Sequence, residues 1–293
     1  MEITYTIEEN NKTIKQILKE RLFISDRLLT LLKKNSLILY NNDKITNLNI
    51  LARLNSTVTV DLNFEEDNNN IVPIKMDLKI IYEDEALLII DKPAGIPVHP
   101  SILHYTNSLS NGVKYYFDSI NLKKKIRPVN RLDRNTSGIV IFAKNQYIQE
   151  CLIHQMQTKE FKKTYLAVVE GHLKKLNGTI DAPITRKENS IIERCVAENG
   201  EKSITHYKVL KQNFEKNYDI VECLLETGRT HQIRVHLSYI GHPLIGDTLY
   251  GNNSKYISRQ ALHAYKVEFI HPITNKLTQF TSDLPKDFVS FII

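Results

Sequence analysis

The sequence predicts an α+β protein, with a mostly antiparallel mixed sheet and flanking helices preceded by a small N-terminal α/β domain. After residue 77 strand patterns outnumber helical ones, and no regular βαβ alternation appears. The first 64 residues carry their own set of two helical patterns followed by strand patterns. The polar run EEDNNN at 65–70 separates the two parts. We therefore expect a domain at 1–64, a linker at 65–76 and a second domain at 77–293.

Two short helices are predicted first. Thr13 is a suitable N-cap for the first helix. After it, apolar residues recur at helical spacing at Ile14, Ile17, Leu18 and Leu22. Ser25 can cap the second helix, DRLLTLLKKN, which Asn35 can end. The apolar stripe of this second helix is predicted to consist of Leu28, Leu31 and Leu32.

Strands complete the N-terminal domain. SLILYNNDKIT predicts two short strands about an Asn-Asn-Asp turn. TVTVDLNF alternates with period two, which predicts a strand with one apolar face made of Val58, Val60, Leu62 and Phe64.

The second domain begins with KIIYEDEALLIIDKPAG, a predicted strand pair that ends in a Pro-Gly turn. GIVIFAK, TYLAVVEG, HYKVL and YDIVECLLE are further predicted strands, because they are apolar and rich in β-branched residues. Two helices are predicted, over QYIQECLIHQM, with a stripe of Ile148, Leu152 and Met156, and over HQIRVHLSYI.

The composition is that of an ordinary globular protein, with 293 residues of which 42% are hydrophobic and 25% are charged. The three cysteines form no CxxC pair, which argues against a disulfide framework and a zinc ribbon. The polar, acidic start of the chain is unlike a signal peptide, and its longest apolar runs are too short to cross a bilayer. We therefore expect a cytoplasmic protein without a membrane partner.

The charge is unevenly distributed along a chain whose net charge is +6. Residues 1–70 carry 9 basic and 10 acidic residues, whereas residues 71–293 carry the remaining 30 and 23. The excess peaks in KKKIRPVNRLDR at 123–134, with six cations and one acid. Such a run can be a solvated face or a nucleic-acid contact, and charge alone leaves both open.

The acid in that run, Asp133, lies between Arg131 and Arg134 in the motif RLDRNTSG. Taken alone, the motif is typical of a salt-bridged turn. The common catalytic motifs are missing, since there is no phosphate-binding loop, GxGxxG, GxSxG or HExxH. His231 and His236 are five residues apart and would lie on different faces of a helix, so a shared metal is not expected. With the nucleotide-binding motifs also missing, we expect no metal and no nucleotide cofactor.

Together with four other segments, RLDRNTSG resembles the RluA-type pseudouridine synthases over residues 77–293. The other segments are DKPAGIPVHP, KKTYLAVVEG, TGRTHQIRVHLSYIGHPLIGDTLYG and ALHAYKVEFIHP. RLDRNTSG with TGRTHQIRVHL is a very specific combination. The N-terminal elements resemble the S-four RNA-binding domain, named after a ribosomal protein, although they contain no diagnostic motif.

The resemblance implies the pseudouridine synthase fold and a redox-neutral isomerisation of uridine in structured RNA. The family's aspartate nucleophile corresponds to Asp133, and a carboxylate attacks only while ionised. The family's arginine partner corresponds to Arg234, which would favour that form. The family's tyrosine corresponds to Tyr165, which would stack on the base and take the ring proton. Without the resemblance, Tyr165 would be interpreted as a core aromatic residue.

RNA contacts are the second implication. Arg131 corresponds to the family residue that fills the gap left by a flipped base, although a simple phosphate contact is an alternative. Asn130 stands where the family usually has His, so it either positions the loop or weakens a phosphate contact. The expected RNA-binding residues are Asn130, Arg131, Arg134, Arg229, His231, Lys33 and Lys34.

We expect a monomeric enzyme that acts on ribosomal RNA. A synthase for transfer RNA, a catalytically silent RNA-binding protein of the same fold, and an unrelated hydrolase with an Asp–His pair are the alternatives. The hydrolase is disfavoured by the missing metal spacing and by the lack of a Ser or Cys nucleophile setting. The sequence does not name the target uridine, because RNA specificity depends on loop shape and splayed bases.

Overall fold

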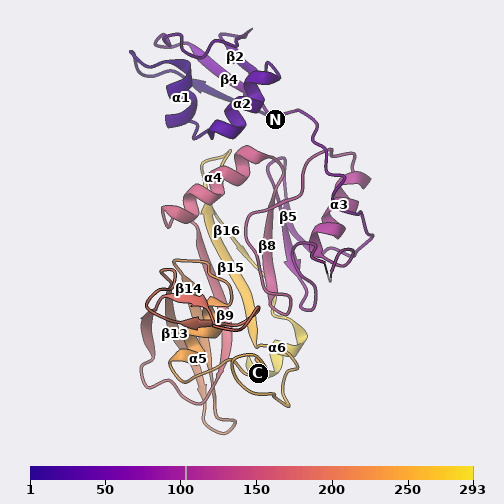
Figure 1. Ribbon diagram of the computed structural model, residues 1–293, viewed down its shortest axis with the longest axis vertical. Coiled ribbons are helices and arrows are strands. Elements are labelled where there is room, and N and C mark those ends of the chain that lie inside the picture. Colours follow the sequence, from indigo (N-terminus) through magenta and orange to yellow (C-terminus); the bar gives the residue numbers. More distant parts are fainter. Residues whose placement is uncertain (103, 293) are drawn as a thin grey trace.

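Two separate β-sheets organise the chain, and they form an upper and a lower part in Figure 1. The structure is a computed structural model that describes residues 1–102 and 104–292. The predicted α+β class is confirmed, with a large, mostly antiparallel sheet and few helices. In the described residues no helix is long and apolar enough to span a membrane.

The N-terminal sheet is antiparallel and has the strand order β1-β4-β2-β3. Two helices pack against it, and their apolar residues form its core. The elements are β1 (Glu2–Thr6), α1 (Ile14–Glu20), α2 (Asp26–Lys34), β2 (Ile38–Tyr40), β3 (Asp43–Lys44) and β4 (Thr57–Asp61).

The caps and the turn of this domain confirm the sequence predictions. Thr13 forms a capping box with Gln16, and Ser25 Oγ accepts a hydrogen bond from the Leu28 amide at 3.2 Å. Asn41 and Asn42 both take left-handed backbone angles in the turn between β2 and β3.

Two details of the N-terminal domain differ from the prediction. Leu29 rather than Leu31 joins the buried face of α2, so the buried stripe is rotated about the helix axis relative to the predicted one. Strand β1 was not predicted. Its apolar face consists only of Ile3 and Tyr5, which are half-buried against the core, whereas Val58 and Val60 of β4 are fully buried.

The large sheet has the main order β10-β13-β14-β9-β15-β8-β6-β5, with β16 added to β15 and β7 added to β8. Its pairings are antiparallel except between β15 and β8. The strands are β5 (Ile80–Glu83), β6 (Leu87–Lys92), β7 (Arg127–Pro128), β8 (Ser137–Ala143), β9 (Lys162–Glu170), β10 (Asn177–Asp181), β13 (Ile204–Asn213), β14 (Tyr218–Leu225), β15 (Leu262–Ile270) and β16 (Leu277–Thr281).

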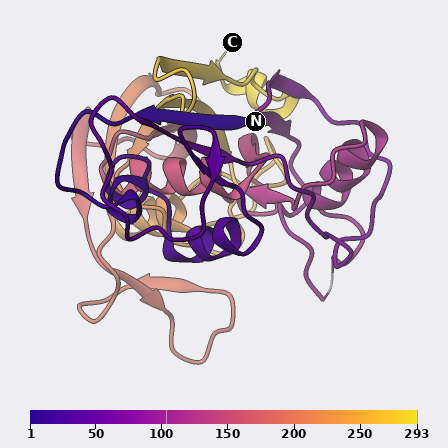
Figure 2. The same cartoon turned by 90° about the horizontal axis from the view of Figure 1, so that it is seen from above.

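Four helices flank the large sheet. The predicted α4 (Gln146–Gln157) and α5 (Gln232–Tyr239) are confirmed, whereas α3 (Leu109–Ser119) and α6 (Lys286–Ile292) were not predicted. A separate hairpin of β11 (Ile184–Arg186) and β12 (Arg194–Val196) projects from the body as an arm, which Figure 2 shows from above.

The N-terminal domain is packed onto α4, which lies beneath it in Figure 1. One apolar cluster contains the core of the N-terminal domain together with Tyr147, Ile148 and Leu152 of α4. Ser25 Oγ also donates a hydrogen bond to Glu150 of α4 at 2.6 Å. The two parts therefore share a core, and the boundaries at residues 64 and 77 stay a prediction.

The segment predicted as a linker is held against the second domain. Arg127 forms a two-pronged ion pair with Glu66, at 2.5 and 2.7 Å. The ammonium of Lys124 donates to the carbonyls of Leu62 and Phe64, at 2.7 and 2.6 Å. These contacts fix the path of the chain between the two sheets.

Candidate active site

Asp133 lies in a loop between β7 and β8, and hydrogen bonds from a buried lysine hold this loop in place. The Lys92 side chain is fully buried, and its ammonium donates to the carbonyls of Pro93, Ile96 and Arg134 at 2.9, 2.9 and 3.0 Å. Burial lowers the Lys92 pKa to about 7, assisted by nearby Arg259 and opposed by Asp133. The lysine thus joins the DKPAG turn to the RLDR loop.

The loop enters β8 at a position that only glycine tolerates. Gly138 has φ +111°, and a Cβ there would come within 2.2 Å of the Ala264 carbonyl oxygen of β15. This close approach permits the short parallel pairing of β8 with β15. It also fixes where the loop that carries Asp133 ends.

Arg234 of α5 connects Asp133 to a second carboxylate. Its Nη1 lies 3.1 Å from Asp133 Oδ2, whereas its Nε and Nη2 contact the two oxygens of Asp247 at 2.7 and 2.8 Å. Burial disfavours the guanidinium charge, but the two carboxylates outweigh this and raise the Arg234 pKa. Asp247, which is almost fully buried, therefore orients the arginine that faces Asp133.

His231 and Tyr250 form the side of this arrangement. His231 Nε2 lies 3.8 Å from Asp133 Oδ2, which is beyond hydrogen-bond distance, and its Nδ1 is 2.8 Å from the Tyr250 hydroxyl. Burial lowers the His231 pKa despite the Asp133 charge. The Tyr250 ring also stacks under the Arg234 guanidinium, with 5.0 Å from Cζ to the ring centroid.

Tyr165 comes from β9 and faces the same small pocket as Asp133. Its side chain is buried, and burial raises its pKa, with a further contribution from the Asp133 charge. The neutral phenol is therefore its resting form at neutral pH. The pocket has a volume of about 60 Å³ and is lined by Asp133, Tyr165, Leu225, His231, Arg234 and Leu262, among others.

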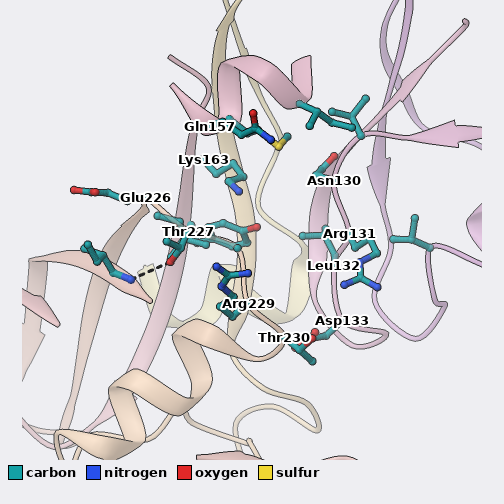
Figure 3. Close-up of a pocket in the computed structure, with 18 of the residues that line it drawn as sticks. Asn130, Arg131, Leu132, Asp133, Gln157, Lys163, Glu226, Thr227, Arg229 and Thr230 are labelled. Carbon is teal, nitrogen blue, oxygen red and sulfur yellow. Dashed lines mark hydrogen bonds between the residues drawn. The ribbon is translucent and has the colours of Figure 1, made fainter. Parts of the chain in front are cut away.

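A wider cleft of about 820 Å³ leads to Asp133. Figure 3 shows Asp133 at its base and Lys163 farther up, with Gln157 of α4 at the opposite end. The cations that line it are Arg131, Lys159, Lys163, Lys202 and Arg229. A cleft of this size and sign suits a polyanion such as RNA, with one nucleotide reaching the acid.

The RNA-binding candidates fall into different environments. Arg131 is exposed and lines the cleft, and Arg229 lines it while ion-paired to Glu201. Arg134 is exposed but lies outside the described lining residues, with Nη1 3.4 Å from His104 Nε2. Lys33 and Lys34 are exposed at the end of α2, away from the described cleft lining.

Both amide groups of Asn130 are occupied by strand β8. Its Nδ2 donates to the Ile139 carbonyl and its Oδ1 accepts from the Ile141 amide, each at 2.9 Å. Of the two alternatives for this position, the contacts favour positioning of the loop over a phosphate contact. A neutral amide is sufficient for that task.

Sequence reasoning assigned no role to Asp247, Tyr250 or Lys92. All three lie in segments that carry the family resemblance, GDTLYG and DKPAG. The sequence therefore indicated that these segments belong to the site, but it did not indicate which contacts the three side chains make. Pairing of Asp247 with Arg234 across a loop has no periodicity that a sequence pattern could report. In the described residues no group of three or more His, Cys, Asp or Glu could hold a metal ion.

Comparison with known proteins agrees with this geometry. A family model described as RNA pseudouridylate synthase matches residues 86–239. An uncharacterized RNA pseudouridine synthase, YhcT of Bacillus subtilis, is 38% identical over 98% of this chain and 94% of its own length. Ribosomal large subunit pseudouridine synthase D of Zymomonas mobilis is 37% identical over 78% of this chain and 76% of its own length.

A solved structure shows the same fold. Human RNA pseudouridylate synthase domain containing 1 has a TM-score of 0.59 and 27% identity, covering 71% of this chain and 84% of its own. The chain belongs to the RluA family of RNA pseudouridine synthases, which are isomerases.

Proposed function

We propose that this synthase converts uridine to pseudouridine in ribosomal RNA, with Asp133 as the nucleophile. The observation that carries the proposal is the Arg234 guanidinium, which contacts Asp133 at 3.1 Å and is itself clamped by Asp247 at the base of a cationic cleft. A clamped cation offers the carboxylate a directed, charge-assisted hydrogen bond and so aims it at the substrate.

In the proposed reaction the target base leaves its stack and enters the small pocket beside Asp133. The Asp133 carboxylate attacks the first ribose carbon, and the bond between that carbon and the base nitrogen breaks, with the electron pair staying on the base. The base then turns, and its fifth ring carbon attacks the same ribose carbon and displaces the carboxylate, which is thereby regenerated. The fifth carbon loses its proton and the freed ring nitrogen gains one, so the product is an isomer of the substrate.

Tyr165 is proposed to stack on the base and to receive the released proton. Its raised pKa favours the neutral phenol, so Tyr165 can take the ring proton only while its own hydroxyl proton passes to an acceptor, and the regenerated Asp133 carboxylate of the same pocket is such an acceptor. Arg131 is proposed to fill the gap that the flipped base leaves, because it is exposed beside the nucleophile and lines the cleft.

The nucleophile is tested with Asp133→Asn, which is nearly isosteric but cannot supply the anion. We expect no release of tritium from RNA labelled at the fifth carbon of uridine, while RNA binding in a gel shift is largely kept. Asp118→Asn is a matched control, because Asp118 is a partly exposed ion-pair partner of Lys114 on α3. Near-normal turnover in Asp133→Asn would sink the assignment.

The choice of ribosomal RNA rests on relatives named as ribosomal large subunit pseudouridine synthases, in Zymomonas mobilis and Nitrosomonas europaea. Transfer RNA is the alternative substrate. Mapping pseudouridines in both RNA classes from a strain lacking this protein distinguishes them. A site lost only from transfer RNA would replace the ribosomal target.

A further inference from the structure

Phe23 places an apolar ring on the surface at the connection between α1 and α2. Its side chain is 53% exposed, although both neighbours, Leu22 and Ile24, are buried in the core of the N-terminal domain. The two neighbours anchor the connection, and the ring between them points outward. The N-terminal core therefore does not account for an aromatic residue at this position.

The backbone at Phe23 is unfavourable for a bulky residue. Its φ is +53°, in the left-handed region that glycine occupies without penalty. The Ile24 amide donates to the Leu18 carbonyl at 3.0 Å, which holds the turn in this form. A large side chain in this conformation is an outlier of the kind that accompanies functional surfaces.

The ring of Phe23 stacks on a histidine of the other domain. Its centroid lies 4.9 Å from that of His154 on α4, with an interplanar angle of 29°. His154 is itself exposed. Because one face of Phe23 covers His154, the exposed part of the ring leaves an aromatic surface available to solvent.

This ring pair borders the cleft. Ile153, Met156 and Gln157 of the same helix line the cleft, and Gln157 is three residues from His154 and thus adjacent on the helix surface. Figure 3 shows Gln157 at the end of the cleft away from Asp133, and Figure 1 shows α4 between the N-terminal domain and the large sheet. Lys163 lines the cleft on the same side, as does Lys159, which is ion-paired with Glu226 at 2.5 Å.

We propose that Phe23 and His154 form a platform on which an unpaired base of the RNA substrate stacks, outside the pocket for the target uridine. The cations of the adjoining cleft select a polyanion, and an aromatic face accepts any base. A protein partner would be expected to meet a wider apolar surface than one ring. The proposal rests on the family's action on RNA and not on the role of Asp133.

The chain contains no tryptophan, which provides a direct test. Phe23→Trp keeps the stacking surface and creates the sole indole, whose emission should be quenched when a base stacks on it. The probe is in-vitro transcribed, unmodified ribosomal RNA at low salt, with the bound fraction measured by filter binding on the same samples. The same quench is expected in an Asp133→Asn background, so loss of turnover does not affect this measurement.

Phe214→Trp is the matched control. Phe214 is also an exposed ring beside a histidine, with 4.4 Å between its centroid and that of His172. It lies in the β13–β14 turn, at the far end of β14 from the cleft residue Leu225. Tyr218, which begins β14 beside that turn, is seven residues from Leu225, or about 23 Å along an extended strand. We expect no change in the emission of Phe214→Trp when RNA binds.

Phe23→Leu adds an affinity measurement. Leucine meets the same backbone penalty and keeps an apolar contact to His154, but it offers no aromatic face. RNA affinity should fall by about five-fold or more, which is the lower range for loss of one stacked base. Unchanged Phe23→Trp emission with fully bound RNA would overturn the proposal. An equal change in Phe214→Trp would overturn it as well, because the quench would then not be local.

Discussion

The N-terminal domain and the floor of the cleft both contain close ion pairs, but the first is exposed to water and the second is buried. In the N-terminal domain Lys19 pairs with Asp26 at 2.8 Å, with side-chain exposures of 41% and 75%. At the cleft floor Arg234 pairs with Asp247 at 2.7 Å, with exposures of 8% and 1%. The distances are alike, but water screens the first pair and hardly reaches the second.

The comparison shows that the solvent exposure of an ion pair decides what the pair contributes to the structure. An exposed pair mainly neutralises two charges locally, and water screens what remains of their attraction. A buried pair fixes geometry, since neither partner can turn to water, and Arg234 thereby holds Asp133. In the described part of the N-terminal domain, the helix cations without an ion pair are Lys15, Arg27, Lys33 and Lys34.

The strongest test of the cleft floor is Arg234→Ala. It removes the group that contacts Asp133, so we expect pseudouridine formation to fall at least about 10³-fold, comparable with loss of Asp133. Tritium release under single-turnover conditions measures this, and thermal unfolding of the same sample reports folding. A mild effect on a folded variant would mean that Arg234 is not the group that positions Asp133 for the reaction.

Asp247→Ala should show how much the buried ion pair contributes to stability. It leaves the Arg234 charge buried with one partner fewer, so the free energy of unfolding should fall by about 3–5 kcal/mol. Asp26→Ala in the exposed pair should have a far smaller effect. Urea denaturation of both variants measures the difference, and equal losses would break the comparison.

Tyr165→Phe separates stacking from proton transfer in the catalytic domain. The ring stays, and the hydroxyl is lost. If the hydroxyl takes the ring proton, the chemical step should slow by roughly 10²-fold or more, while RNA affinity changes little. Rapid-quench measurement at saturating RNA isolates that step. Full activity would leave stacking as the role of Tyr165.

The smallest effect is expected from the N-terminal cations. Replacing Lys15, Arg27, Lys33 and Lys34 by alanine should weaken binding to a large folded RNA at low salt more than at high salt. Each lost phosphate contact should flatten the plot of log affinity against log salt by somewhat under one unit. Single-turnover chemistry at saturation should stay the same.

Lys19→Ala provides the matched control for those cations, because Asp26 already neutralises this lysine. Its salt slope should equal that of the wild type. If neither variant changes the slope, the N-terminal domain is not a phosphate-binding module, and a structural role becomes the better interpretation. Substitution is preferable to truncation here, because removing the domain would expose the apolar residues of α4 that share its core.

Local rules in the sequence determined much of this protein. Thr13 and Ser25 cap the first two helices, and Asn41 and Asn42 make the predicted turn, because caps and left-handed turns depend on residues a few positions apart. The strands β8, β9 and β14 were predicted for the same reason, since their apolar runs are local. The site residues came from the family resemblance and not from local rules, and Asp133, Tyr165 and Arg234 line one pocket.

Tertiary structure alone decided how those parts meet. The clamp of Asp247 on Arg234, the support of the Asp133 loop by Lys92 and the hydrogen bonds of the Asn130 amide to β8 all join residues that no sequence period relates. The docking of the N-terminal domain on α4, with Phe23 on His154, is equally non-local. Such contacts depend on which surfaces the packed core brings together, and a pattern along the chain carries no signal for that.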